Sequence, residues 1–276
     1  QGKGVVLGPG DDAAILSGCR KDEQLVFCGD MLIEGVHFDL KQATLEDVGY
    51  KAVARTISDV AAMGGKPLYM GFSLALPRKH RSRISDIVKG ARRLLDVFGV
   101  SLAGGDLSHA ERIMCDTWCI GTVRKGRYFR RSGARPGDAL FVSGPLGGSY
   151  ASRRHLRFIP RVEQARWLGK QVKVGGMIDI SDGLALDLYR MLNESKAGAV
   201  VYEDALPLNP GCTPTDALYD GEDYELLFSA PTAQAAKLER NGFVRIGEIC
   251  AGGRIMLRTS KGRQRTLQVR GFSSLS

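Results

Sequence analysis

Strand-like and helix-like segments alternate along the chain, and this alternation limits the fold more than any other feature of the sequence. The clearest helix is expected over residues 84–98, where apolar side chains recur at helical spacing and Gly99 follows the last turn. Another helix is expected from Thr44, a capping residue with Asp47 three positions later, to the glycine pair at 64–65. The pattern predicts a mixed α/β protein.

The expected strands are short and apolar. In the first half they cover residues 25–28, 72–76, 100–105 and 113–123, and in the second half 139–143, 176–180, 199–202, 224–229 and 243–246. Two more helices are expected, one capped by Ser181-Asp182 and one around residues 232–241. A basic segment that contains Gly and Pro separates the halves, so we predict two domains, residues 1–125 and 126–276.

The composition is that of a globular protein, with 43% hydrophobic and 25% charged residues among 276. No apolar run approaches the roughly 18 residues that cross a bilayer, so we expect no membrane contact and a cytoplasmic location. The six cysteines form no CxxC pair, which favours free thiols over a zinc site. Because the chain starts at Gln1 and not at Met, we expect further residues upstream.

The net charge of +9, from 39 Lys and Arg against 30 Asp and Glu, raises the question of an anionic partner. Two basic stretches stand out, residues 78–83 and 124–135, and the second has Tyr128 and Phe129 among its arginines. Such a stretch can follow a phosphate backbone while its rings stack on bases. A solvated surface is the simpler interpretation of the first stretch, and a nucleotide- or RNA-binding module stays open for the second.

The acidic residues are more informative, because several stand where a charge is costly. Asp30 ends an apolar strand, Asp106 follows the segment VSLAGG, and Asp179 lies inside GMIDI. Other acidic residues beside glycine or in apolar surroundings are Asp11, Asp12, Asp59, Asp182, Glu222 and Asp223. Burying a charge without a partner is unfavourable, so these positions need an explanation. The ends of strands are the edge at which open α/β sheets bind ligands, which favours a binding site.

Simpler roles exist for some of these residues. Asp182 can cap a helix, and Asp59 can form an ion pair with Arg55, one helical turn earlier. The two acidic pairs that follow glycine can be turn residues. The three strand-end aspartates have no such local role, so the argument for a site depends on them.

Electrostatics restricts what a gathering of these carboxylates can do. Two like charges about 5 Å apart, at an effective dielectric constant near 20, repel by roughly 3 kcal/mol. Five or six therefore need raised pKa values or bound cations to share a pocket. Oxygen ligands without EF-hand spacing favour Mg²⁺ used together with phosphate. The GxxxxGK[ST], GxGxxG, HExxH and GxSxG motifs are absent from the sequence, so we expect an unusual ATP site built from metal-binding aspartates.

Seven motifs, in this order, resemble one enzyme family. They are GDDAAIL, CGDMLIEGVHF, ISDVAAMGGKP, AGGD, RRSGARPGD, MIDISDGLALDL and DGEDYELLF, with a weaker echo at residues 270–272. The SDVAAMGGKP motif is similar to stretches in selenophosphate synthetases, hydrogenase-maturation dehydratases and the purine enzyme, so it indicates a superfamily. GVHF together with GEDYEL resembles the thiamine-monophosphate kinases of the aminoimidazole-ribonucleotide-synthase-like superfamily.

The resemblance implies an α/β (α+β) architecture of two domains. The N-terminal mixed sheet with helices would pair across a homodimer, the C-terminal half would form an α/β sandwich, and ATP would lie in the cleft between them. The implied magnesium ligands are Asp12, Cys28, Gly29, Asp30, Asp59, Asp106, Asp179 and Asp182. The family usually has two hydroxyl residues where Cys28 and Gly29 stand, so their metal contacts would come from backbone carbonyls.

The resemblance also implies contacts for both substrates. Gly105, Asp106, Arg131 and Ser181 match positions that contact the nucleotide. His37, Glu222 and Phe272 match positions that hold thiamine phosphate. A contact between Arg131 and ATP would account for the second basic stretch, which argues against a nucleic-acid partner.

The implied reaction is ATP plus thiamine monophosphate to ADP plus thiamine diphosphate, with several Mg²⁺ ions. The nucleophile is a phosphate oxygen that is already largely ionised at pH 7, so no general base is needed. Asp30 and Asp59 are expected to be the most critical residues. The alternatives are a sister enzyme of the superfamily acting on another acceptor, selenophosphate-synthetase-like or purine-synthase-like, and a non-catalytic nucleotide- or RNA-binding module.

Overall fold

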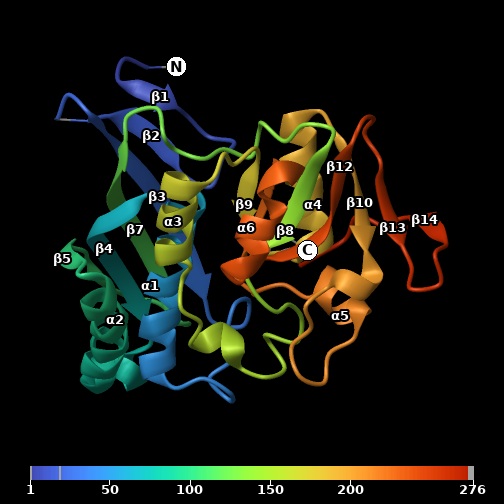
Figure 1. Ribbon diagram of the computed structural model, residues 1–276. Helices are drawn as coiled ribbons and strands as arrows, with labels where there is room; N and C mark the ends of the chain where they lie inside the picture. The colour runs from blue at the N-terminus through green and yellow to red at the C-terminus, as the bar shows by residue number, and fades with distance from the viewer. Residues whose placement is uncertain (1, 19, 273–276) are drawn as a thin grey trace.

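The computed structural model describes residues 2–18 and 20–272, which form two mixed sheets with helices between and around them (Figure 1). The first sheet contains β1 (Val5–Leu7), β2 (Ala14–Ser17), β3 (Glu23–Ile33), β4 (Lys66–Leu76), β5 (Ser101–Gly104), β6 (Leu107–His109) and β7 (Met114–Arg124). Its strand order is β1-β2-β3-β7-β4-β5, with β6 also paired to β4. Only β5 and β6 run parallel to β4 among the described pairs, and the rest are antiparallel.

Two helices cover one face of this sheet, α1 (Leu45–Ala62) and α2 (Ile84–Phe98), the second after a short 3₁₀ turn η1 (Arg78–Arg83). Thr44 caps α1, and its side chain accepts from the backbone amide of Asp47 while the Asp47 carboxylate accepts in return. Gly99 ends α2 with a left-handed φ of 62°. Both predicted helices and their caps are therefore confirmed.

The second sheet follows in the chain and has the order β14-β13-β10-β12-β8-β11-β9. Its strands are β8 (Asp138–Val142), β9 (Met177–Asp179), β10 (Gly198–Tyr202), β11 (Leu226–Pro231), β12 (Val244–Cys250), β13 (Ile255–Arg258) and β14 (Gln264–Thr266). The helices and 3₁₀ turns of this half are η2 (Arg154–Leu156), α3 (Val162–Gln171), α4 (Leu184–Ser195), η3 (Glu203–Ala205), α5 (Pro214–Tyr219), η4 (Thr232–Gln234) and α6 (Ala235–Arg240). The predicted mixed α/β class is confirmed.

Each predicted strand is present, but the boundaries differ. The expected segment at 25–28 is part of the eleven-residue β3, in which buried residues alternate with more exposed ones over most of the strand. The strands β1, β2, β6, β13 and β14 and the helices α3 and α5 were not predicted. Most of these strands are three or four residues long, too short for an alternating pattern to be visible in sequence.

The two halves share one apolar core, and α1 is at its centre. Val53 and Ile57 of α1 belong to the same buried cluster as Leu168 of α3 and Phe141 and Phe228 of the second sheet. Helix α1 thus has one side on the first sheet and the other toward α3 and β9 (Figure 1). This position lets side chains of α1 reach the space between the halves.

The five described cysteines are free thiols, as expected, and Cys28, Cys115 and Cys119 are buried. Cys19 lies outside the described residues. None of the helices in residues 2–18 and 20–272 combines the length and apolar character that crossing a bilayer requires.

Candidate active site

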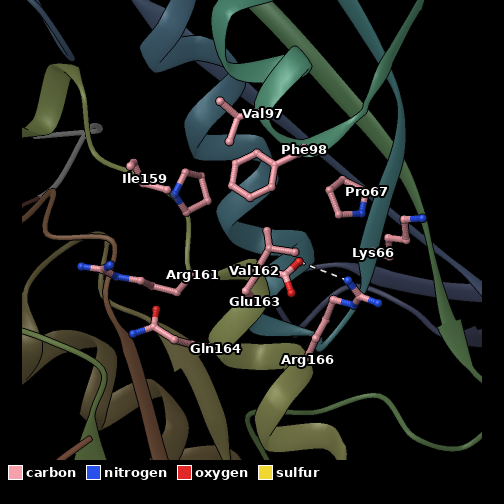
Figure 2. Close-up of a pocket in the computed structure, with 11 residues that line it drawn as sticks. Lys66, Pro67, Val97, Phe98, Ile159, Arg161, Val162, Glu163, Gln164 and Arg166 are labelled. Carbon is pink, nitrogen blue, oxygen red and sulfur yellow. Dashed lines mark hydrogen bonds and ion pairs between the residues drawn. The ribbon is translucent and has the colours of Figure 1, made fainter. Parts of the chain in front are cut away.

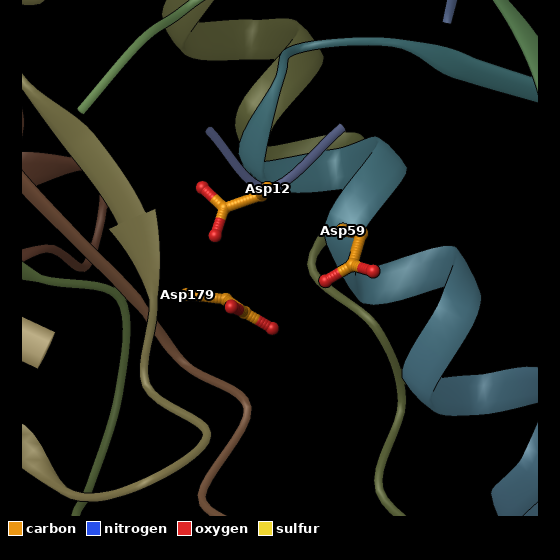
Figure 3. Close-up of side chains that lie close together, drawn as sticks. All are labelled: Asp12, Asp59 and Asp179. Carbon is orange, nitrogen blue, oxygen red and sulfur yellow. The ribbon is translucent and has the colours of Figure 1, made fainter. Parts of the chain in front are cut away.

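Three aspartates from distant parts of the chain converge between the two halves. Asp12 lies between β1 and β2, Asp59 is on α1, and Asp179 ends β9 (Figure 3). One carboxylate oxygen from each lies within 4.8 Å of the others. We call Asp12, Asp59 and Asp179 the aspartate trio. The sequence predicted all three, but only the fold brings them together.

The trio is electrostatically unfavourable without a cation. Burial raises the pKa of all three carboxyl groups, most strongly for Asp59 and Asp179. Charges of other members of the trio raise the pKa of Asp59 and Asp179 further. For Asp12 the added charge is that of Asp11, and Arg131 opposes the shift.

Asp179 accepts a hydrogen bond of 2.6 Å from Ser58 Oγ, and Asp12 Oδ1 accepts one of 2.6 Å from Arg131 Nη2. Asp12 Oδ2 is buried with no hydrogen-bond partner among the described residues. The arrangement is therefore suited to a bound cation.

Asp182 lies close enough to Asp30 for its charge to affect the pKa of Asp30. Burial raises the pKa of Asp30, and the charges of Glu222 and Asp182 add to this while Arg55 opposes it. Arg55 Nη2 is 3.5 Å from Asp30 Oδ1, and Arg190 Nη1 is 2.7 Å from Asp182 Oδ2. These carboxylates thus extend the acidic region beyond the trio.

The expected cap of α4 was wrong. The helix begins after Gly183, and the backbone amides of Ser181 and Asp182 donate to Asp187 Oδ2 at 3.0 and 2.9 Å. Asp187 is buried and was not predicted, although its spacing three to four residues into a helix is a known capping signal. Because Asp187 accepts from these amides, the Asp182 carboxylate does not cap the helix.

The simpler interpretation of Asp59 also fails. Arg55 pairs with Asp30, and no ion pair between Arg55 and Asp59 is present in the described structure. Asp59 is instead surrounded by other carboxylates, since the charges of Asp30, Asp179 and Asp12 all raise its pKa.

Two of the residues predicted to hold thiamine phosphate, Glu222 and Phe272, are fixed by backbone hydrogen bonds around one loop. Glu222 has a positive φ of 68°, an uncommon conformation for a non-glycine residue, and its amide donates to Ser181 O at 2.7 Å. The Phe272 amide donates to Asp182 O at 2.9 Å, and a Cβ at Gly271 would be 2.3 Å from the same oxygen. Glu222 and Phe272 are therefore both fixed to the segment that follows β9.

His37, the third predicted acceptor residue, is buried at the end of β3. Its Nδ1 accepts a hydrogen bond of 3.0 Å from the Ile33 amide. Burial, together with the charge of Arg55, lowers the pKa of His37 to about 4, so the ring is neutral at pH 7. The structure links His37 to Glu222 through a lysine that the sequence did not single out, Lys51 on α1.

The remaining predicted residues are more dispersed. Gly105 approaches Phe72 O so closely that a Cβ would be 1.9 Å away, and Asp106 next to it is exposed between β5 and β6. No contact in the described residues joins the Asp106 carboxylate to the trio. Cys28 donates its thiol to Thr56 O at 3.3 Å and so faces α1, with Gly29 following it in β3.

A separate cavity of about 370 Å³ lies elsewhere, between the C-terminus of α2, the start of β4 and the start of α3 (Figure 2). Its walls combine Val97, Phe98 and Ile159 with the surface pair Glu163–Arg166. It includes no member of the trio and no predicted substrate residue. The candidate site is therefore the acidic region between the halves and not this cavity.

The raised pKa values predict how the metal-free protein responds to pH. A carboxyl group with a higher pKa in the folded state keeps its proton longer there, so stability falls as pH rises between the two pKa values. This applies to Asp59 and Asp179, whose pKa values are raised well above the ordinary range by burial and neighbouring carboxylates, and to Asp187, whose pKa is raised by burial to about 7. His37 and His155 have lowered pKa values and oppose the trend by less than about 1 kcal/mol together.

We therefore expect urea unfolding in EDTA to show a stability that falls between pH 6.5 and 7.5, because the folded state retains protons that the unfolded state has lost. Saturating Mg²⁺ should reduce this slope, because a bound cation favours the ionised carboxylates in the folded state. Stability that is constant or rises over this interval would contradict the raised pKa values.

Comparisons with known proteins agree with this fold. Family models described as AIR synthase related protein, N-terminal domain and C-terminal domain match residues 10–123 and 135–259. The thiamine-monophosphate kinase of Rhodopirellula baltica is 35% identical over 290 residues, covering 97% of this chain and 91% of the relative. That of Bacillus subtilis is 36% identical over 251 residues, covering 80% and 77%.

Solved structures show the same likeness. A structure described as AaThiL complexed with AMPPCP and TMP has a TM-score of 0.84 at 30% identity, covering 95% of this chain and 90% of that one. The thiamine-monophosphate kinase from Stenotrophomonas maltophilia K279a has a TM-score of 0.80 at 31% identity, covering 92% and 91%. The chain therefore belongs to the thiamine-monophosphate kinase family of the AIR synthase related proteins.

Proposed function

We propose that this chain transfers the γ-phosphoryl group of ATP to thiamine monophosphate, giving ADP and thiamine diphosphate. The aspartate trio carries the proposal, because three buried, mutually repelling carboxylates are a suitable ligand set for cations that bring two phosphorylated substrates together. The family supports the acceptor, since its members bear the name of this activity and one is described with AMPPCP and TMP bound.

The residues of the trio fit Mg²⁺. They offer carboxylate oxygens only, and Asp12 Oδ2 has no hydrogen-bond partner to lose. Asp30 and Asp182 are proposed to hold further ions, as several Mg²⁺ would be needed for two polyanionic substrates. Bound Mg²⁺ supplies neutralisation of phosphate charge and orientation of the transferred group. Asp106 and the backbone of Cys28 and Gly29 are additional proposed ligands that rest on the resemblance to the family.

The chain's own residues position the nucleotide. Arg131 pairs with Asp12 in the described structure, and its Nε is buried without a partner. We expect Arg131, through its unpartnered Nε, to donate to a phosphate oxygen of ATP. Gly105 and Ser181 are proposed to contact the nucleotide through their backbone, together with Asp106.

The acceptor contacts are proposed for His37, Glu222 and Phe272. Glu222 is a carboxylate at pH 7, since its pKa is lowered to about 2, and can accept a hydrogen bond from the amino group of thiamine. Phe272 is partly exposed and can stack on the thiazolium ring, with a cation–π contribution. Because the acceptor phosphate is already ionised, these residues orient it and no side chain has to remove a proton.

A homodimer through the first sheet is proposed as well. This sheet exposes large apolar side chains from four strands, namely Phe27, Met31, Tyr69, Leu102 and Leu107. Such an apolar patch is typical of an interface. We expect Tyr69→Glu to shift the protein to monomers in light scattering, while Val97→Glu, an exposed position on α2, leaves the mass unchanged. Equal masses for both variants would contradict this interface.

The domain boundary at residues 125/126 and the cytoplasmic location are further proposals. The boundary is supported by the two sheets, which occupy residues 5–124 and 138–266. The location is supported by the free thiols of the five described cysteines, which are typical of a reducing compartment.

The deciding experiment incubates the protein with ATP, Mg²⁺ and a panel of phosphorylated acceptors, and separates the products by chromatography. We expect ADP and thiamine diphosphate in equal amounts from thiamine monophosphate, and no product when Mg²⁺ is chelated. Consumption of another acceptor with no thiamine diphosphate would show that the ATP site serves a sister reaction.

A further inference from the structure

Lys51 is a fully buried lysine in the middle of α1, with a side chain 0% exposed. Its ammonium group contacts three acceptors from separate segments. Nζ donates to His37 O at 2.6 Å, lies 2.7 Å from His155 Nδ1, and forms an ion pair with Glu222 Oε2. A lysine ammonium has three protons, so each has one acceptor and none is left for a ligand.

The charges of this group are defined by its surroundings. Burial lowers the pKa of Lys51 to about 8, while the Glu222 carboxylate opposes this, so the lysine is still mostly charged at pH 7. Burial and the charge of Lys51 lower the pKa of His155, so its ring is neutral and Nδ1 accepts from Lys51. Glu222 stays ionised because the charges of Lys51 and Arg55 and the hydrogen bond from Lys51 outweigh its burial.

The contacts occupy one oxygen of Glu222 and leave the other available. The described residues make their side-chain contacts with Oε2. Oε1 has no hydrogen bond in the described structure and is not among the buried atoms that lack one, so it stays accessible. Since the Glu222 backbone has an uncommon positive φ, the direction of this carboxylate depends on its side-chain contacts.

We propose that Lys51, supported by His155, is a positioning residue of the acceptor pocket that presents Glu222 Oε1 to the amino group of the thiamine pyrimidine ring. The inference rests on the proposed function, because that function supplies the acceptor. Among the described residues, Lys51 makes no contact with the trio. It fixes the distance between two predicted acceptor residues, His37 and Glu222, which come from different halves of the chain.

The test compares two acceptors in wild type and in Lys51→Met. With thiamine monophosphate we expect the variant to raise KM about 10- to 100-fold, with kcat and the KM for ATP changed less than about threefold. With oxythiamine monophosphate, in which an oxygen replaces the amino group, the variant and wild type should differ by less than about threefold, because the contact that Lys51 orients is missing. Lys89→Met, which removes an exposed lysine paired with Glu46, is the matched control and should behave as wild type.

Because Lys51→Met leaves a buried carboxylate unpaired, a second variant keeps the test decisive if the first does not fold. Lys51→Met/Glu222→Gln removes both charges, and we expect it to fold and to have the same KM for thiamine monophosphate as Glu222→Gln alone, because Lys51 acts through Glu222. An equal loss on both acceptors, or a loss confined to kcat, would overturn the positioning role. Failure of wild type to use thiamine monophosphate would instead overturn the proposed function, so the two failures are distinguishable.

Discussion

Replacing Asp59 with asparagine should reduce turnover by at least about 10³-fold and leave the protein folded. Its carboxylate is one of three whose oxygens lie within 4.8 Å of one another, and the proposed cations would need all three. Removing a preorganised charge that stabilises the transferring phosphoryl group costs about 10²–10³-fold, and a lost metal site adds to this. In the metal-free protein the substitution also removes repulsion from Asp12 and Asp179, so stability should not fall.

Two measurements check this prediction together. Product formation reports activity, and thermal unfolding with and without Mg²⁺ reports metal binding. We expect Mg²⁺ to raise the Tm of wild type and to have a much smaller effect on Asp59→Asn. Asp86→Asn is the matched control, since Asp86 is also helical but pairs with Arg83 on the surface. Near-normal turnover in Asp59→Asn would remove the argument for a metal site in the trio.

Replacing Arg161 with methionine should destabilise the protein by about 3 kcal/mol. Arg161, just before α3, pairs with the Glu225 carboxylate through two nitrogens, and Ser143 Oγ donates to Glu225 Oε2 at 2.6 Å. The Glu225 side chain is 1% exposed, so the variant leaves a buried carboxylate with one hydroxyl partner. The Arg161 side chain is 31% exposed, and access of water places the cost at the lower end of the range for buried pairs.

Arg166 on α3 provides a control from the same stretch of chain (Figure 2). Arg166 Nη1 is 3.1 Å from Glu163 Oε1, but the Glu163 side chain is 78% exposed, so Arg166→Met should cost less than about 1 kcal/mol. Urea unfolding at pH 7 measures both values. Equal effects of Arg161→Met and Arg166→Met would contradict the role of burial in this pair.

The helices that the sequence predicted best are those with local signals. Thr44, Asp47 and Gly99 act within one turn of the helix that they cap, so their pattern alone places the ends of α1 and α2. The short edge strands lack such signals, because pairing with a neighbouring strand decides them.

Helix α5 does have one, since Thr213 and Asp216 form a capping box with Pro214 at the first helical position, so this missed helix was recognisable from the sequence. The expected cap of α4 was wrong because either Asp182 or Asp187 can satisfy the amides and only the folded loop selects Asp187.

The residues of the candidate site also divide into those with a local sequence signal and those that only the fold identifies. Asp30 and Asp179 were predicted because a carboxylate in an apolar strand is costly in any fold. Lys51 and His155 were not, because a lysine on a helix is usually solvated and its burial depends on a loop 171 residues later in the chain. The simpler interpretation of Asp59 fails for the same reason. Arg55 pairs with Asp30 on strand β3 and not with Asp59 on its own helix.

The sequence by itself therefore determined the kind of chemistry, through the number and placement of its aspartates, and the family, through the order of its motifs. The tertiary structure alone decided which carboxylates share one site and which residues hold the acceptor side. The physical reason is that a buried charge is recognisable wherever it occurs along the chain, whereas its partner is chosen by distance in space. Lys51 with Glu222, and Asp12 with Asp59 and Asp179, are adjacent only after both halves have packed against α1.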